Sequence, residues 1–370
     1  MRMIRSNEFN DKKILLVEKE PKTRNDRTWC FWEQEPGFFE DLVYHKWGEL
    51  LFKTDEEVRR LKMGQYKYKM IRGIDFYNKC FSEIDLQKNI EVMYGEISWG
   101  GEVNNFKKFQ VNNEFVIGGE QTIIFNSVYR SEATQKDKFY LLQHFKGWII
   151  ETKQKFFNPG EATLMDFSVS QTHGTTFVYV LPLCETKALV EYTIFSEKKL
   201  SEEEYNQELT SYLQNTKGLG AFTVVEEEFG IIPMTNAHLP RFRNGMYFIG
   251  TAGGATKPST GYTFRFIQKQ ADEIVEQLIA NGRLPVATKG ENRFKFYDAT
   301  LLHILAKKLL DGKHIFSTLF KKNDASKIFK FLDNESTVGE EIKLLNTLPK
   351  KVFMIAGFKE FLKMITRKNR

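Results

Sequence analysis

Glu191 is a carboxylic acid in the middle of an otherwise apolar or weakly polar segment, Leu189-Val190-Glu191-Tyr192-Thr193. Because side chains alternate along a strand, Leu189, Glu191 and Thr193 are expected to share one face. Burial raises the pKa of a carboxylic acid, so that the group keeps its proton and can donate it to a weakly basic substrate. The alternative interpretation is an exposed strand glutamate without a chemical role.

A glycine-rich segment, Asn244–Phe266, has the composition of a ligand-binding turn. It predicts a strand at 246–249, a turn that contains Gly250, Gly253 and Gly254, and a helix that begins near Pro258-Ser259-Thr260-Gly261. Glycines let a ligand approach the backbone, and the first turn of a helix offers unpaired N–H donors. This geometry suits an anion or an electron-rich ring. A tight turn with a purely structural role fits the pattern equally.

Lys12–Glu20 is a short apolar strand that ends in Glu18. In a dinucleotide-binding βαβ unit, the second strand ends in an acidic residue that accepts hydrogen bonds from the ribose. The glycine fingerprint of such a unit should come about 20 residues earlier, and no glycine precedes Glu18. Either the fold is different, or the given chain lacks the first strand and the glycine loop, and Met1–Ile4 is the last turn of the connecting helix.

Two further segments contain residues suited to ligand contact. Arg24–Trp32 combines Trp29, Phe31 and Trp32 with Arg27 in a predicted loop, where aromatic rings pack against either a ligand or the core. Arg72 follows a predicted strand at 66–71 and precedes a helix start. Its guanidinium can lie along a phosphate or a ring system, or form a surface ion pair.

The remaining elements follow from hydrophobic periodicity. Short β-like runs fill 89–127, and 122–127 resembles a buried strand returning to a nucleotide-binding sheet. Residues 139–195 alternate as an antiparallel sheet does, and 226–235 is expected to return to the central sheet. Ser201 with Glu204 forms a capping-box pattern for a helix over 201–215, and a second helix runs to about Ala280.

Composition narrows the class of protein. The 370 residues, 41% of them hydrophobic, contain no apolar run of transmembrane length, and three cysteines without CxxC spacing fit a reducing compartment. The six scattered histidines predict no metal site. Residues 281–370 hold 19 Lys and Arg against 9 Asp and Glu, an excess of +10 in a chain of net charge +6. The helices expected at 300–310 and 352–365 either cap the body or lie on an anionic bilayer surface.

In order and spacing, six segments resemble the flavin-binding bacterial lycopene β-cyclases. They are N-D-R-T-W-C-F-W at 25–32, Y-K-M-I-R-G-I-D-F-Y at 68–77, F-V-Y-V-L-P-L at 177–183, L-V-E-Y-T at 189–193, E-E-F-G-I-I-P-M-T at 227–235 and G-T-A-G-G-A-T-K-P-S-T-G-Y at 250–262. The resemblance extends to about residue 280, and the basic helical tail is similar as well. Asn126-Ser127 replaces an acidic-Gly-Arg-Gly element of many relatives, and Tyr192 replaces the second acidic residue of a FLEET-like motif.

The resemblance implies an α/β fold with an FAD-binding Rossmann-like domain at 1–135 and 225–282, an antiparallel β-sheet substrate domain at 136–224 and a basic helical region at 283–370. It also implies that the first strand and the GxGxxG loop are missing because the chain starts late, at an internal methionine. Reduced FAD would be the cofactor, with NAD(P)H as the reductant. Its expected contacts are Glu18, Arg72, Gly250, Gly253, Gly254, Pro258, Thr260, Gly261 and Tyr262.

By the same resemblance, Glu191 is the acid that starts cyclisation of lycopene and related acyclic carotenoids, and Arg27, Trp29, Phe31 and Trp32 line the polyene channel. An insoluble substrate implies a cytoplasmic protein that contacts the inner membrane surface peripherally, and no nucleic-acid partner is expected. The alternatives are an FAD-dependent monooxygenase or prenyl reductase, or a carotenoid-binding relative without catalysis.

Overall fold

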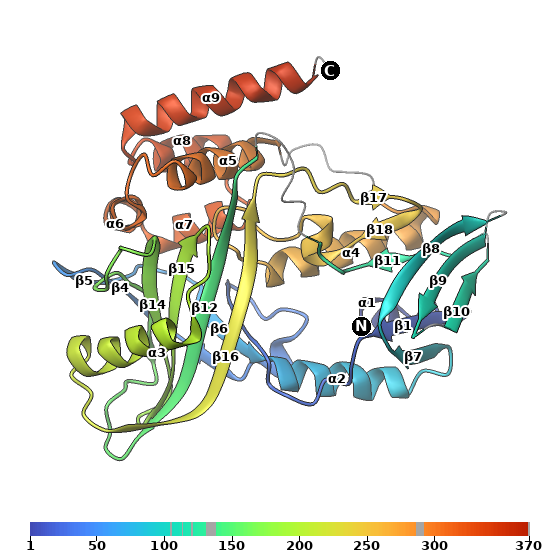
Figure 1. Cartoon of the computed structure of the whole chain (residues 1–370), viewed down its shortest axis with the longest axis horizontal. Coiled ribbons are helices and arrows are strands. Elements are labelled where there is room, and N and C mark those ends of the chain that lie inside the picture. The colour runs from blue at the N-terminus through green and yellow to red at the C-terminus, as the bar shows by residue number, and fades with distance from the viewer. Residues whose placement is uncertain (104–105, 113, 120, 131–137, 286–291, 369–370) are drawn as a thin grey trace.

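The computed structural model describes residues 1–103, 106–112, 114–119, 121–130, 138–285 and 292–368. Figure 1 shows a large sheet with long strands beside a smaller group of strands, and the C-terminal helices stacked above the large sheet.

The large sheet has seven strands in the order β16-β12-β15-β14-β13-β4-β5. Their bounds are β4 Glu49–Lys53, β5 Val58–Arg60, β12 Tyr140–Thr152, β13 Glu161–Asp166, β14 Thr175–Cys184, β15 Lys187–Ser196 and β16 Phe222–Thr235. Neighbouring strands are antiparallel except β13 and β4, which are parallel. The long alternating segments at 139–195 therefore form the predicted antiparallel sheet.

One face of this sheet is covered by α3 (Glu202–Ser211) and by the π-helical turn η2 (Tyr212–Thr216). Tyr205, Leu209 and Tyr212 pack there against Tyr192 and other buried residues of the sheet. The capping box that the sequence predicts is present, since the Ser201 side chain accepts from the backbone of Glu204 and the Glu204 carboxylate accepts from Ser201.

The other face is covered by a three-stranded sheet in the order β2-β6-β3 and by C-terminal helices. The elements here are β2 Thr28–Glu33, β3 His45–Trp47, β6 Lys67–Arg72, the 3₁₀ turn η1 Glu40–Leu42 and α2 Gly73–Asp85. A strand followed directly by a helix at Arg72 is the arrangement predicted from the sequence. Trp32 and Tyr68 belong to the main core beneath the large sheet.

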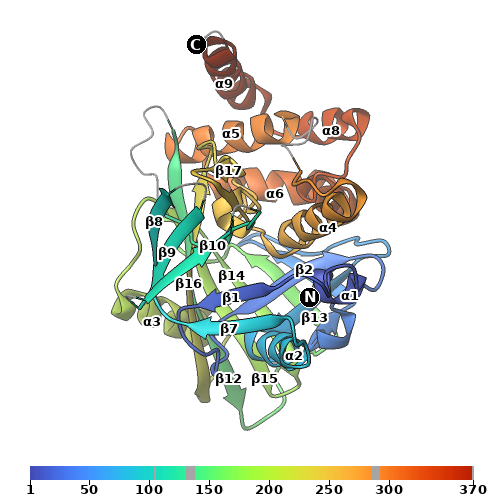
Figure 2. The ribbon, with the colours of Figure 1, turned by 90° about the vertical axis from the view of Figure 1, so that its right-hand side faces the viewer.

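The strands expected in a nucleotide-binding unit form two separate parallel pairs. β1 (Ile14–Glu18) pairs with β7 (Ile90–Tyr94), and β11 (Phe125–Asn126) pairs with β18 (Met246–Phe248). Within the described ranges no hydrogen bond joins the two pairs. The other elements of this region, which Figure 2 shows from the side, are α1 Arg2–Ser6, β8 Ile97–Val103, β9 Phe106–Val111, β10 Glu114–Gly118 and β17 Phe242–Arg243.

The glycine-rich segment folds differently from the prediction at one point. β18 leads into a 3₁₀ turn, η3 (Gly250–Gly253), but α4 spans Phe264–Asn281 and does not begin near Pro258. The expected helix start was wrong because Gly261 adopts a left-handed φ of +72° and the Lys257 N–H bonds the carbonyl of Tyr262. Those contacts close a separate hydrogen-bonded turn before the helix.

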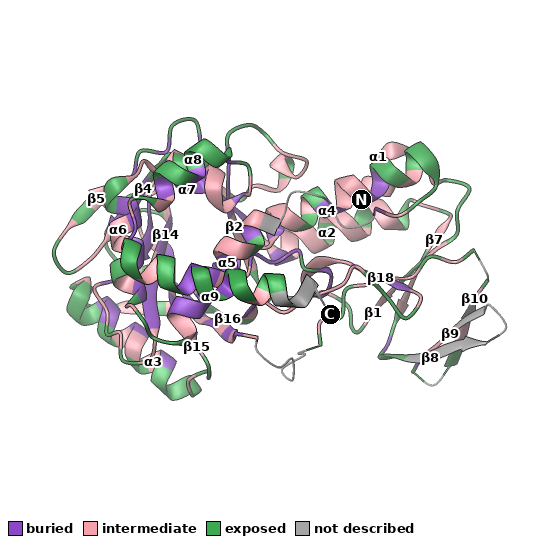
Figure 3. Ribbon diagram, turned by 90° about the horizontal axis from the view of Figure 1, so that it is seen from above, coloured by how far each residue is buried: buried purple, intermediate pink, exposed green. Residues whose placement is uncertain are grey.

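Five helices follow: α5 Asn292–Ala306, α6 Gly312–Lys322, α7 Ala325–Leu332, α8 Val338–Leu345 and α9 Lys350–Lys368. The helical tail is confirmed, although the helix expected at 300–310 starts earlier. α9 lies at the top of the molecule in Figure 1, and the view from above in Figure 3 shows many exposed residues along it. In the described part of the chain, no helix has both the length and the apolar character needed to cross a membrane.

Two expectations about the sheets need correction. β16, expected in the central nucleotide-binding sheet, pairs with β12 along the edge of the seven-stranded sheet. β4 and β5 also join that sheet from the N-terminal part of the chain. The large sheet therefore extends beyond the range 136–224, because strands distant in sequence supply both of its edges.

Candidate functional site

Glu191 lies in β15 on the face of the large sheet opposite α3. Its side chain shares this face with Thr193, as predicted, and the Thr193 hydroxyl donates a hydrogen bond of 2.7 Å to Glu191 Oε1. Tyr192 faces the other way and is fully buried beneath α3. A carboxyl group at position 192 would therefore point away from the Glu191 side of the sheet.

A second carboxyl group, Glu228 of β16, lies beside Glu191. Gly147 of β12 is directly opposite Glu191 on one side and directly opposite Glu228 on the other. The two glutamates are therefore two strand spacings apart, roughly 10 Å between backbones, and their side chains meet over Gly147. A Cβ atom at Gly147 would lie 2.9 Å from Cγ of Glu228, so glycine leaves the space that the carboxyl group occupies.

Both glutamates hold their protons more tightly than ordinary carboxyl groups. Burial raises the pKa of Glu191 well above its usual value, and the charge of Glu228 adds to the increase. Burial also raises the pKa of Glu228, although hydrogen bonds from Thr28 and Glu191 oppose this increase. Both side chains keep some accessible surface, as expected for groups that line an internal space.

Three aromatic hydroxyl groups form a tyrosine wall around Glu191, and one of them, Tyr179, belongs to the neighbouring strand of the same sheet. Tyr68 of β6, Tyr179 of β14 and Tyr262 of the glycine-rich turn interact with Glu191, and Tyr262 also interacts with both other tyrosines. Cys30 of β2 also faces Glu191. Burial raises the pKa of all four groups, so they are neutral at pH 7. Glu191 is thus surrounded by neutral aromatic and acidic groups.

A second glycine on the same face makes room for another ring. Gly230 of β16 lies opposite Phe145 of β12, and a Cβ atom at Gly230 would be 2.2 Å from Cζ of that ring. The Phe145 ring therefore lies flat over the strand, two residues along from the position of Glu228. Aromatic faces carry partial negative charge and stabilise nearby cations.

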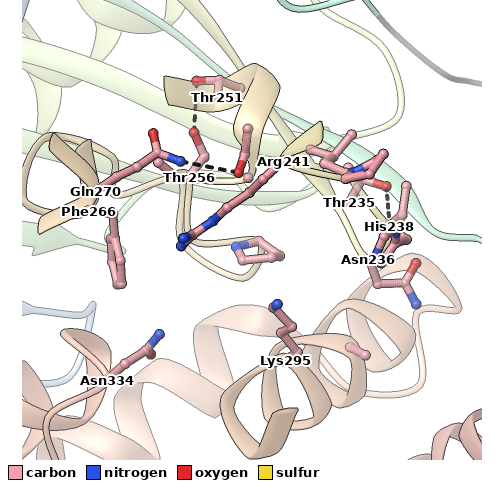
Figure 4. A pocket seen from close by; sticks show the side chains of 18 of the residues that line it. Thr235, Asn236, His238, Arg241, Thr251, Thr256, Phe266, Gln270, Lys295 and Asn334 are labelled. Atoms are coloured by element: carbon pink, nitrogen blue, oxygen red, sulfur yellow. Dashed lines mark hydrogen bonds between the residues drawn. The ribbon is translucent and has the colours of Figure 1, made fainter. Parts of the chain in front are cut away.

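A large cavity lies on another side of the glycine-rich turn. Its volume is about 1480 Å³, and Gly253, Gly254 and Pro258 line it together with residues of α4, α5 and α9. In Figure 4, Arg241 and Phe266 point into it from one wall and Lys295 from the opposite wall. Glu191 and Glu228 do not line this cavity, so the cavity and the acidic pair are separate features.

The turn at 250–262 connects these two features. Its first part lines the cavity, whereas Gly261 and Tyr262 approach the acidic pair. Two buried oxygen atoms at its end, Thr260 Oγ1 and Gln143 Oε1, have no hydrogen-bond partner among the described residues. Gln143 Oε1 is 2.1 Å from where a Cβ of Gly261 would be, so the amide lies against bare backbone. An unpaired acceptor and hydroxyl suit the polar edge of a flavin ring.

The other predicted cofactor contacts have local partners. Glu18 Oε1 accepts from the Lys19 backbone at 2.8 Å and pairs with Lys22 at 3.2 Å. Arg72 forms two hydrogen bonds with Asp75, of 2.6 and 2.8 Å, at the start of α2. The surface-pair alternative describes Arg72 in this structure, and cofactor contact by Glu18 and Arg72 stays a prediction.

The predicted channel residues divide between two clusters. Trp32 stacks on Phe329 at 4.4 Å and contacts Tyr262, on the Glu191 side of β2. Trp29 and Phe31 face the other way and pack against Phe264. Arg27 is near Glu18 and pairs with Asp26 at 3.1 Å. The structure therefore brings only Trp32 of the four close to the acid site.

The sequence interpretation missed Glu228, Gly147 and the tyrosine wall. Glu228 lies in a motif used for the resemblance, but no role was given to it, because a partner two strands away depends on strand register. The available signal was a glycine in the middle of a long predicted strand, which often marks a close approach of other groups.

Solved structures share the fold. A flavoprotein/dehydrogenase from Cytophaga hutchinsonii aligns over 97% of this chain and 95% of its own, with a TM-score of 0.59 and 12% identity. A geranylgeranyl bacteriochlorophyll reductase-like protein from Thermoplasma acidophilum aligns over 94% and 93%, with a TM-score of 0.55 and 15% identity. The chain thus has the mixed α/β fold of FAD-dependent oxidoreductases, which confirms the predicted fold class.

Sequence comparison gives the family. The model of the family described as lycopene cyclase protein matches residues 4–356, so the chain belongs to the lycopene cyclase family. A lycopene beta-cyclase of Pantoea ananas is 25% identical over 283 residues, which are 71% of this chain and 67% of the relative. A lycopene beta-cyclase of Pseudescherichia vulneris is 26% identical over 272 residues, with the same coverage.

Proposed function

We propose that the chain is a lycopene β-cyclase that converts the acyclic ψ end groups of lycopene into β rings without net redox change, giving γ-carotene and β-carotene. The observation that carries the proposal is the pair of Glu191 and Glu228 on either side of Gly147, where burial raises the pKa of Glu191 well above its usual value. An alkene is a very weak base, so the first step needs an acid in a site from which water is excluded.

The reaction balances as a proton relay. Glu191 gives its proton to the terminal double bond, which leaves a tertiary cation. The next alkene along the chain attacks this cation, which closes a six-membered ring and moves the positive charge onto a ring carbon, and loss of the adjacent ring proton forms the ring double bond. Phe145 and the tyrosines around Glu191 provide π faces beside the cation and keep water away from it.

FAD is the proposed cofactor, with NAD(P)H as its reductant. Gly253, Gly254 and Pro258 on the cavity side, and Thr260 and Gly261 with Gln143 on the acid side, would hold it. When bound in its reduced form, the flavin supplies negative charge near the cation. Support comes from the flavoprotein fold and from the two unpaired oxygen atoms at the turn.

The test is pigment analysis in cells that accumulate lycopene. The unchanged chain should yield β-ring carotenoids, Glu191→Gln should leave lycopene unconverted, and the matched control Glu227→Gln should behave as the unchanged chain. Glu227 precedes Glu228 but pairs with Lys146 on the opposite face. β-ring formation by Glu191→Gln would refute the acid role, and a soluble chain that leaves lycopene unchanged would refute the cyclase function.

A reductase or monooxygenase is the competing function, because the fold is shared with redox flavoproteins. Such an enzyme consumes NAD(P)H in proportion to product, whereas a cyclase needs reduced flavin without net consumption. We expect NAD(P)H oxidation well below the amount of β rings formed. Equal amounts would favour the redox enzyme, and carotenoid binding without conversion would favour a non-catalytic relative.

α9 is the proposed contact with the membrane surface. It packs on α5 through Ala356 and Glu360, and the opposite side exposes a row of apolar side chains. These are Met354, Ile355, Phe358, Phe361, Leu362, Met364 and Ile365. Lysines stand beside them at 359 and 363. An apolar row bordered by cations suits the surface of an anionic bilayer, where the insoluble substrate is found.

The membrane contact can be tested by flotation with vesicles of phosphatidylglycerol or phosphatidylcholine. Binding should be stronger to phosphatidylglycerol, and Phe358→Ser with Phe361→Ser should reduce it at least tenfold, since each buried Phe contributes about 2 kcal/mol. Leu86→Ser is the control, because Leu86 is the most exposed of the large apolar residues in the described part and is far from α9. Equal vesicle binding by the double variant and by Leu86→Ser would refute the membrane contact. A dimer of the unchanged chain that the double variant disrupts and Leu86→Ser does not would also refute it, because the apolar row would then contact a second copy of the chain.

A further inference from the structure

We propose that Glu191 and Glu228 act as one acid that shares a single proton across Gly147, and that Glu228 is the positioning residue that keeps this proton on Glu191. The proposal rests on the cyclase function proposed above and deepens it. It concerns a residue for which neither the reaction scheme nor the family resemblance provides a role.

Strand register brings the two carboxyl groups together. Gly147 is the residue between them, and its missing side chain leaves no atom to separate them. Hydrogen bonds fix one oxygen of each group. Thr193 donates to Glu191 Oε1 and Thr28 donates to Glu228 Oε2, both at 2.7 Å. The two carboxyl groups also interact electrostatically, because the charge of Glu228 raises the pKa of Glu191.

A hydrogen bond between two carboxyl groups needs one proton. If both were ionised, two negative charges would face each other, which strongly disfavours the doubly charged state. Among the described residues, none of the leading electrostatic influences on either carboxyl group is a positive charge. Those facing Glu191 are neutral or acidic, and those facing Glu228 are Glu226 and Asp26, the latter paired with Arg27 and Tyr77.

The shared proton defines a complete cycle. Glu191 transfers it to the substrate alkene, and the two carboxylates then provide two negative charges beside the cation, which stabilise it. After ring closure, the ring proton returns to the pair. One C–H bond forms, one C–C bond forms and one C–H bond breaks, and the pair ends with the proton number with which it began. No oxidant or reductant is consumed.

The direct test is infrared spectroscopy of the protonated carboxyl group in the purified full chain, which does not depend on activity. The unchanged chain should show a protonated-carboxyl carbonyl band that persists at neutral pH and disappears only in alkali. Glu228→Gln removes the charge that retains the proton, so the band should disappear at lower pH. Glu191→Gln should abolish it at neutral pH, and Glu227→Gln should leave it unchanged.

Gly147→Ala is the second variant, because it alters no ionisable group. Its methyl group would separate the carboxyl groups, so the band should again disappear at lower pH. It also remains informative if Glu228→Gln fails to fold. If the band has the same pH dependence in the unchanged chain as in whichever of Glu228→Gln and Gly147→Ala folds, the two carboxyl groups do not share a proton. This conclusion holds whatever the activity of the variants.

The pH profile of β-ring formation separates this proposal from the cyclase proposal. Glu228→Gln should lose about tenfold more activity at the alkaline end of the range than at the acid end, since tenfold corresponds to one unit of pKa. A loss that is uniform across pH would indicate a merely structural role and refute the proposal. Activity in Glu191→Gln would instead overturn the proposed acid.

Discussion

The buried ion pair of Lys257 and Asp298 should make the stability of the glycine-rich turn sensitive to the loss of either partner alone. Lys257 Nζ is 3.1 Å from Asp298 Oδ1, and the two side chains are 1% and 6% exposed. Nζ also donates to Asn334 at 2.8 Å, and Ser259 donates to the same carboxylate at 2.5 Å. The pair thus ties the turn to α5 and to the end of α7.

Replacing Lys257 by Met would leave the Asp298 carboxylate buried with Ser259 as its remaining donor among these contacts. Removing one partner of a buried pair destabilises a protein by about 3–5 kcal/mol, whereas replacing both partners by apolar residues is often neutral. We therefore expect Lys257→Met to lower the free energy of unfolding by about 3 kcal/mol or more, and the double variant Lys257→Met with Asp298→Leu to recover most of it.

Urea unfolding followed by circular dichroism measures these differences. The matched control is Lys155→Met, which removes an ion pair of 2.7 Å to Glu185 whose side chains are 75% and 52% exposed. Exposed pairs contribute about 0–1 kcal/mol. The reasoning would be refuted if Lys257→Met destabilised the protein no more than Lys155→Met, or if the double variant were as unstable as the single one.

Three other predictions follow from the same structure. Gly261→Ala should destabilise the chain by about 1–3 kcal/mol more than Gly282→Ala, because both residues have left-handed φ but only Gly261 meets a crowding atom; equal urea midpoints would contradict this. Glu191→Gln should be more stable than the unchanged chain, by an amount that grows from pH 5 to pH 8. A raised native pKa gives stability at low pH that is lost as pH rises, and thermal melts at both pH values check the sign. Burial lowers the pKa of His144 from 6.5 to about 4. The free energy of unfolding should therefore decrease as the pH drops from about 6.5 to about 4, by up to about 3 kcal/mol. His144→Leu should reduce that fall, and an equal fall would refute the assignment.

Local patterns predicted the elements that depend on neighbouring residues. The capping box at Ser201, the strand that ends in Glu18 and the shared face of Glu191 and Thr193 are all confirmed. Each depends on residues within four positions along the chain, where side-chain periodicity and hydrogen-bond geometry act directly. Such signals do not require knowledge of the rest of the fold.

Features that depend on distant segments could not be derived in this way. β16 has the composition of a strand, but only pairing with β12 places Glu228 next to Glu191. The segment at 24–32 was predicted as a loop, but residues 28–33 form the strand β2, whose two faces separate Trp29 from Trp32. The two residues were therefore assigned together although they belong to different clusters. Strand register and sheet stacking decide such questions.

Glycine at position 147 reconciles two opposing demands on the acid. A carboxyl group that stays protonated at neutral pH has a raised pKa and is therefore a weaker proton donor. In this site, the carboxylate that raises the pKa of Glu191 also becomes part of the negative charge that stabilises the cation after transfer. A longer side chain at position 147 would keep Glu228 away from Glu191, and both effects would be lost. Gly147 of β12 therefore determines the acid strength of Glu191 in the neighbouring strand β15.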